Sequence, residues 1–289
     1  MIFDFVFSKK ELSKAQFFQW LIDEMIANGW ENLSVNKASV DHCTMFSTGE
    51  SGNEKIGVQL RKFYSSEGYD FPTTIYSYIS ARAFHSYTAS PSITKAGEYL
   101  PNQDFTNIRV SNDLRPDENI SVYYHINKDR AIVVVENPDN PMSQNLTSMF
   151  FVIGKPYTIA DYDEFCTSAV ITSQGSIDCR SGVVGYDSEK RHFDSTFLDM
   201  FSNKNNNSHF AKNIVLQNAL DGYKYVVENI FVSSYGSKTL TVDMRKNTFK
   251  DSEGRVYKQF INNFTSTILN SAFRSFIIRI GWWYETYKI

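Results

Sequence analysis

Cysteine is scarce in this sequence, and long apolar runs are missing. The three cysteines, Cys43, Cys166 and Cys179, form neither an even disulfide framework nor the ligand spacing of a zinc site. No stretch of about 18 apolar residues is present, so we expect no membrane-spanning helix. The residues after Met1 lack a basic segment followed by an apolar one, so we expect no signal peptide. Folding in a reducing cytoplasm is the expectation that follows.

An excess of one charge sign is also missing. The chain carries 29 Lys and Arg against 32 Asp and Glu, a formal net charge of -3, and its basic residues form no block. Proteins that bind nucleic acids usually present a basic patch or stripe to the phosphate backbone. We therefore expect no nucleic-acid partner.

Signatures of catalysis are the third absence. The run from Gly49 to Gly52 lacks the Gly-Lys-Ser/Thr ending of a phosphate loop, so it predicts a hairpin turn. His42 and Cys43 are neighbours on a predicted strand and point to opposite faces, which prevents a nucleophile–base pair. His192 and Asp194 share a strand face but have no third ligand in view. We expect no enzyme activity, no cofactor and no metal.

Aromatic residues, by contrast, are abundant, with 17 Tyr and 23 Phe. One interpretation is a β-rich core, because aromatic side chains fit the pleated surface of a sheet. The other is that many of them lie in protein–protein interfaces, which favour Tyr, Trp and Phe. The composition favours the first interpretation and leaves the second open.

Residues 13–28 form the clearest predicted helix. Ser13 is a suitable N-cap with Gln16 three residues later, and Gly29 is suited to the position after the helix. Apolar residues recur at helical spacing, so we expect the stripe of Phe17, Leu21 and Met25 to pack on the first sheet.

Strand patterns follow the helix. Residues 40–46 and 56–63 form a first predicted hairpin, and residues 121–126 and 131–136 form a second. The nearly all-apolar residues 148–154 predict a central strand. Between the hairpins, residues 86–119 are rich in Pro, Asn and Ser and predict a long loop. Further strands are predicted at residues 223–232 and 238–244, with a hairpin over residues 247–260.

These patterns predict an α+β fold, mainly antiparallel β-sheet with one N-terminal amphipathic helix, and two domains. The first domain, residues 1–155, combines the helix with an antiparallel sheet. The second domain, residues 156–289, is β-rich and ends in an apolar strand. Its last residues include Trp282, Trp283 and Tyr284, which we regard as a candidate interface. Either this strand closes the domain's own sheet, or it docks on a neighbouring subunit with a tryptophan as anchor.

Four segments within the first 155 residues stand out by their order along the chain. They are Phe17-x-x-Trp20-Leu21 with Gly29-Trp30, Phe46-Ser47-Thr48-Gly49-Glu50-Ser51-Gly52 with Ile56-Gly57-Val58, the strand pair of residues 121–135, and Phe150-Phe151-Val152-Ile153-Gly154. In this order they resemble structural virion proteins of large contractile-tailed bacteriophages, in the tail, baseplate or neck.

The resemblance implies a non-enzymatic structural subunit that acts in tail, baseplate or neck assembly. Its partners would be copies of itself and other phage structural proteins, with no nucleic acid and no membrane. It would fold in the host cytoplasm and end in the virion. The alternatives are a receptor- or glycan-binding module of the tail and, third, a cell-wall hydrolase, whose paired carboxylates could come from distant positions.

Overall fold

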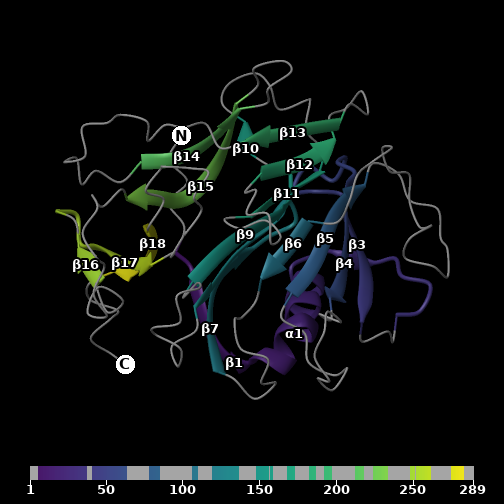
Figure 1. The fold of residues 1–289 in the computed structure, drawn as a ribbon, viewed down its shortest axis with the longest axis horizontal. Helices are drawn as coiled ribbons and strands as arrows, with labels where there is room; N and C mark the ends of the chain where they lie inside the picture. The colour runs from purple at the N-terminus through teal and green to yellow at the C-terminus, as the bar shows by residue number, and fades with distance from the viewer. Residues whose placement is uncertain are drawn as a thin grey trace, which may run out of the picture.

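Three antiparallel β-sheets and one α-helix make up the part of the chain that the computed structural model describes (Figure 1). That part comprises residues 6–37, 41–63, 78–84, 106–109, 119–136, 148–155, 157–158, 168–172, 182–186, 192–196, 212–217, 224–233, 248–250, 252–261 and 275–282. Every strand pair within these ranges is antiparallel. The prediction of an α+β protein that is mainly antiparallel sheet is therefore confirmed.

The central sheet has seven strands in the order β1-β7-β8-β9-β11-β12-β13. Their bounds are β1 Ser8–Ser13, β7 Asn119–Ile126, β8 Arg130–Glu136, β9 Ser148–Gly154, β11 Ser168–Thr172, β12 Gly182–Tyr186 and β13 His192–Thr196. The predicted second hairpin is β7 and β8, and β9 lies between β8 and β11 as a central strand, so both predictions are confirmed.

A five-stranded sheet with the order β2-β3-β4-β5-β6 contains the predicted first hairpin. Its strands are β2 Glu31–Asn32, β3 His42–Ser47, β4 Ile56–Phe63, β5 Tyr78–Phe84 and β6 Thr106–Arg109. Strand β6 lies inside the segment that the sequence predicted to be a long loop, so that prediction is wrong at residues 106–109. Pairing with β5 gives this Pro- and Asn-rich stretch a short strand that its composition does not indicate.

A six-stranded sheet follows the order β10-β15-β18-β17-β16, with β14 also paired to β15. Its strands are β10 Tyr157–Thr158, β14 Lys212–Gln217, β15 Lys224–Ser233, β16 Thr248–Lys250, β17 Arg255–Ile261 and β18 Ser275–Trp282. The predicted hairpin before residue 260 is β16 and β17, and Gly254 in its turn has φ +84°. The predicted strand at residues 238–244 lies outside the described residues.

Helix α1, Lys14–Ala27, begins and ends where the sequence predicted. The Gln16 side chain accepts a hydrogen bond from the Ser13 amide at 3.0 Å, as in a capping box. Gly29 follows the helix with φ +92°, a left-handed conformation that glycine adopts without strain. Phe17, Leu21 and Met25 are each 0% exposed, so the predicted stripe is buried.

The main core lies between the seven-stranded and five-stranded sheets, with α1 packed between them (Figure 1). Leu21 of the helix, Val58 of β4 and Val133 of β8 belong to one cluster of buried apolar residues. The rings of Phe17 and Phe151 meet edge to face at 6.3 Å. Each such side chain contributes roughly 1.5–3 kcal/mol on burial, so this layer is the main source of apolar stabilisation in the described part.

The seven-stranded sheet lies between the other two sheets in Figure 1. Strands β9 and β11 are neighbours in it, although the chain between them first contributes β10 to the six-stranded sheet. The central sheet therefore takes strands from both sides of residue 155. The division into two domains at that residue stays a prediction.

Candidate functional site

The turn from β7 to β8 is held by its own asparagine. The Asn127 side-chain oxygen accepts hydrogen bonds from the amides of Asp129 at 3.0 Å and Arg130 at 2.9 Å. The Asn127 amide donates to the carbonyl of Arg130 at 3.0 Å. This arrangement is the Asx-type turn that asparagine favours, so the sequence determines the turn locally.

The loop between β3 and β4 approaches this turn and is also held by hydrogen bonds of its own. Gly49 and Gly52 have φ +68° and +76°, and the amide of Gly52 donates to the carbonyl of Gly49 at 3.2 Å. The amide of Glu54 donates to the carbonyl of Thr48 at 2.8 Å. The predicted turn at residues 49–52 is confirmed, and glycine supplies the backbone conformation that it needs.

The loop and the turn exchange hydrogen bonds in both directions. The Glu50 amide donates to the Asp129 carboxylate at 2.9 Å, and the Lys128 amide donates to the Glu50 carboxylate at 3.2 Å. The Ser47 hydroxyl donates to the Lys128 carbonyl at 2.5 Å and accepts from the Gly49 amide at 3.1 Å. We call the contacts around residues 127–130 the polar junction.

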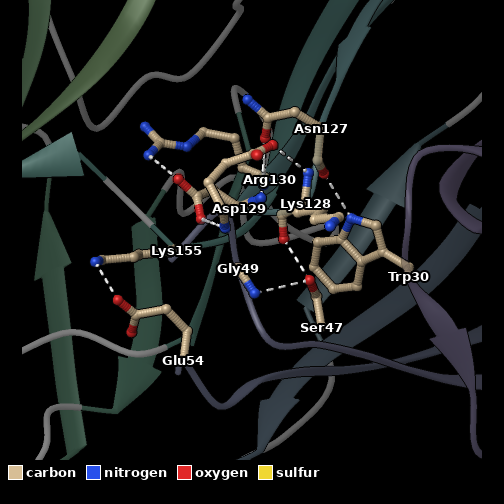
Figure 2. A network of polar contacts seen from close by, with 10 residues as sticks. Trp30, Ser47, Gly49, Glu54, Asn127, Lys128, Asp129, Arg130 and Lys155 are labelled. Atoms are coloured by element: carbon tan, nitrogen blue, oxygen red, sulfur yellow. Dashed lines mark hydrogen bonds and ion pairs between the residues drawn. The ribbon is translucent and has the colours of Figure 1, made fainter. Parts of the chain in front are cut away.

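Two further segments reach the polar junction. The Lys155 amide, just after β9, donates to the Asp129 carbonyl at 2.8 Å, and the Lys155 ammonium pairs with Glu54 at 2.8 Å. The Trp30 indole N–H, just after α1, donates to the Asn127 carbonyl at 2.7 Å (Figure 2). Trp30 is only 3% exposed and belongs to the main apolar cluster.

Glycines allow these segments to come so close. A Cβ atom at Gly154, whose φ is +119°, would lie 2.4 Å from the Asp129 carbonyl oxygen. A Cβ atom at Gly49 would lie 2.8 Å from the Asp129 carboxylate, and one at Gly29 would lie 2.8 Å from the Lys128 side chain. Three separate segments thus use a glycine with positive φ against the same turn.

The contacts of the polar junction fasten separate segments of the chain to one another. Its carboxylates accept hydrogen bonds from backbone amides and pair with an ammonium group, interactions that fix one chain segment to another. Within the described ranges no group of three His, Cys, Asp or Glu side chains is placed to hold a metal ion. The sequence indicated the β3–β4 turn but not its partner, because the two hairpins are far apart along the chain.

Of the three residues in the predicted candidate interface, the structure describes the backbone of Trp282. Trp282 is the last residue of β18, and its backbone is opposite Arg255 of β17. Its side chain, and the whole of Trp283 and Tyr284, lie outside the described residues. Strand β18 lies between β15 and β17, so up to Trp282 the apolar C-terminal strand belongs to the chain's own sheet.

His42 and Cys43 lie on β3, as predicted. Cys43 is 1% exposed in the main core, and burial raises the pKa of its thiol to about 12. His192 and Asp194 lie two residues apart on one strand, β13.

No protein-family profile and no curated protein matches this sequence. Among the described residues, no helix is long and apolar enough to cross a membrane.

Proposed function

We propose that this chain is a non-enzymatic structural subunit of a contractile-tailed phage particle, in its tail, baseplate or neck, and that it acts through protein–protein contacts. One observation carries the proposal. The four segments on which the resemblance rests, which come from separate parts of the first 155 residues, meet at the polar junction. They supply Trp30, Ser47, Asp129 and, at its edge, Gly154. The resemblance therefore rests on one connected unit.

The charged groups of the polar junction hold chain segments together, and this use favours a structural role for the protein. The carboxylates of Asp129 and Glu50 accept hydrogen bonds from backbone amides, and that of Glu54 forms an ion pair with Lys155. These contacts hold the β3–β4 and β7–β8 hairpins in a fixed arrangement. An assembly subunit benefits from such rigidity, because a preorganised surface loses less conformational entropy when it binds a neighbour. The many strands offer a further means of assembly, since a neighbour can extend a sheet by adding a strand at its edge.

The C-terminal residues are the proposed contact to a neighbouring subunit. Two variants separate this role from a role in folding: removal of residues 283–289, and removal of residues 281–289. The longer deletion also removes Gly281 and Trp282, whose backbones are opposite Val256 and Arg255 in the six-stranded sheet. We expect the shorter variant to fold as a stable monomer that no longer enters particles. A shorter variant that assembles normally would exclude these residues as the contact.

The decisive experiment combines particle composition with activity. The chain should be present at stoichiometric level in purified particles of the phage that encodes it, and a cryo-EM map of the particle should show its position and neighbours. The isolated protein should neither lyse bacterial cell walls nor bind bacterial surfaces. Robust lysis that a single Asp or Glu substitution abolishes would establish a hydrolase instead. Saturable binding to host cells or glycans by the free protein would establish a receptor-binding module.

A further inference from the structure

The six-stranded and seven-stranded sheets meet around one lysine. The Lys258 ammonium of β17 pairs with the Glu136 carboxylate of β8 and donates to the Tyr123 hydroxyl of β7 at 2.9 Å. It also lies 4.9 Å from the centre of the Tyr123 ring and 5.0 Å from that of Phe260. We call Tyr123, Glu136, Lys258 and Phe260 the clasp.

The clasp is largely shielded from solvent. The side chains of Lys258 and Glu136 are 14% and 12% exposed. Tyr123 and Phe260 meet edge to face at 5.1 Å and close two sides of the ammonium group. Burial raises the pKa of Tyr123, so the phenol stays neutral and serves as a hydrogen-bond acceptor for the lysine. A charge pair in such surroundings depends strongly on both partners, because either one alone would be left buried without its counter-charge.

A second charge pair lies next to the clasp on the edge strand β1. Lys9 lies 5.8 Å from the centre of the Tyr123 ring and pairs with Glu11 at 2.5 Å. The Ser121 hydroxyl lies within hydrogen-bonding distance of both Glu11 oxygens, at 2.9 and 2.8 Å. Two positive and two negative side chains thus lie close together: Lys9 and Glu11 on β1, Glu136 on β8 and Lys258 on β17. Removal of the Glu136 charge would leave Lys258 near a second lysine.

The described buried apolar side chains of the six-stranded sheet lie outside the main apolar cluster. That cluster takes its described members from α1, the segments around it and the other two sheets, and Val256, Phe260 and Ile278 of β17 and β18 are not among them. Phe260 and Ile278 are nevertheless 0% exposed, so this sheet has buried apolar side chains of its own. Besides the clasp, the Phe7 amide before β1 donates to the Arg279 carbonyl of β18 at 3.1 Å.

From this arrangement we propose that the clasp is a latch that fixes the six-stranded sheet on the seven-stranded sheet, and that its loss releases the two sheets from each other while the main core around α1 stays folded. The Glu136–Lys258 pair fixes one orientation, because β17 must bring its ammonium group to one carboxylate and one hydroxyl at once. Each buried charge depends on its partner, so the loss of either one weakens this boundary directly. This inference does not depend on the proposed function.

The test is hydrogen exchange measured on the full chain by mass spectrometry, with peptides that cover β8, β17 and α1. We expect Glu136→Gln and Lys258→Met each to speed exchange in β8 and β17 about tenfold or more, because each leaves a buried group without its partner. Exchange in α1 should stay within about twofold, since the helix belongs to the main core. The double variant should exchange more slowly than the product of the two single effects predicts.

The matched control is Glu253→Gln on the same β16–β17 hairpin. Glu253 pairs with Arg255 at 3.0 Å, but its side chain is 65% exposed, so its loss should change exchange by less than about twofold. The proposal is overturned if the clasp variants match this control, if the double variant is simply multiplicative, or if α1 loses protection together with β17. Should the single variants fail to fold, the swapped pair Glu136→Lys with Lys258→Glu decides. Recovery of the fold and of β17 protection supports the latch, and no recovery overturns it.

Discussion

Asp129 accepts the backbone amide of Glu50 at 2.9 Å, and Glu50 in turn accepts the amide of Lys128, the neighbour of Asp129, at 3.2 Å. Two turns on different sheets are therefore joined reciprocally, each through the other's backbone. Such a joint needs a carboxylate on each turn and a main-chain amide on the other turn within its reach. The Asp129 and Glu50 carboxylates thus fix the position of the five-stranded sheet relative to the seven-stranded sheet at one end of the main core.

Replacement of Asp129 by alanine should lower the free energy of unfolding by about 1–3 kcal/mol, because the Glu50 amide loses its charged acceptor. Urea unfolding followed by circular dichroism measures the change. The matched control is Asp23→Ala, at an exposed carboxylate on α1 that accepts a hydrogen bond from Gln19 at 2.8 Å. Its effect should stay within about 0.5 kcal/mol. Equal losses of stability in the two variants would contradict the role of Asp129 in the polar junction.

Replacement of Gly154 by alanine should cost on the order of 3 kcal/mol or more, because the new Cβ would meet a backbone oxygen that cannot move aside. Gly52→Ala provides the comparison: its φ is +76°, but nothing lies within 4 Å of the added atom. That variant should cost only about 1 kcal/mol, the strain of a left-handed conformation. Thermal unfolding of both variants measures the difference. A Gly154 variant as stable as the Gly52 variant contradicts the close approach.

Replacement of Trp30 by phenylalanine should destabilise the protein by about 2 kcal/mol, because the Asn127 carbonyl loses its donor and the ring loses volume. Trp20→Phe is the control, since Trp20 is half-buried and its described contacts are with the rings of Phe17 and Tyr124. That change should cost less, and urea unfolding compares the two. A greater loss at Trp20 would show that ring packing outweighs the indole hydrogen bond.

Native Cys43 should resist alkylation. With its pKa raised from 9.0 to about 12 by burial, its thiolate fraction at pH 8 is on the order of 10⁻⁴, against about a tenth in the unfolded chain. Iodoacetamide should therefore modify the Cys43 peptide at least about a hundredfold more slowly in buffer than in urea, as mass spectrometry will show. Rapid native labelling would contradict the buried position.

The same residue predicts a dependence of stability on alkaline pH. The folded state holds the Cys43 proton to a higher pH than the unfolded state does, so this contribution is fully present below pH about 9 and falls as the pH rises towards 12. Cys43→Ala should lack this part of the decline, which denaturant unfolding at pH 8 and pH 10 resolves. Identical declines in both proteins would contradict it.

The sequence predicted the elements whose signals are local. The Ser13–Gln16 capping box, Gly29, the glycine turn at residues 49–52 and the strand at residues 121–126 each have signals within a few residues, and the structure contains each of them. Strand β1 escaped prediction because Ser8–Ser13 contains one apolar residue, and pairing with β7 decides its conformation. The short strand β6 escaped for the same reason.

The polar junction could not be predicted from the sequence, because its residues come from segments that are far apart along the chain. A turn with Asn127 and Asp129 and a loop with Gly49 and Glu50 are common on protein surfaces, and neither indicates the other. Their meeting depends on how two sheets pack across α1, which is a property of the whole core. The clasp is similar: Glu136 and Lys258 are ordinary charged residues on two strands until the sheets bring them together.

The three glycines that close on the Asn127 turn have a consequence for how distant relatives of this chain can be recognised. Residues 29, 49 and 154 combine a positive φ with close neighbours, which favours glycine at each, whereas many buried strand positions between them accept another apolar residue of similar size. Overall similarity can therefore decay while this widely spaced glycine pattern and its Asn-x-Asp turn persist together. A search weighted on those few positions has the best chance of finding homologues whose remaining residues have diverged.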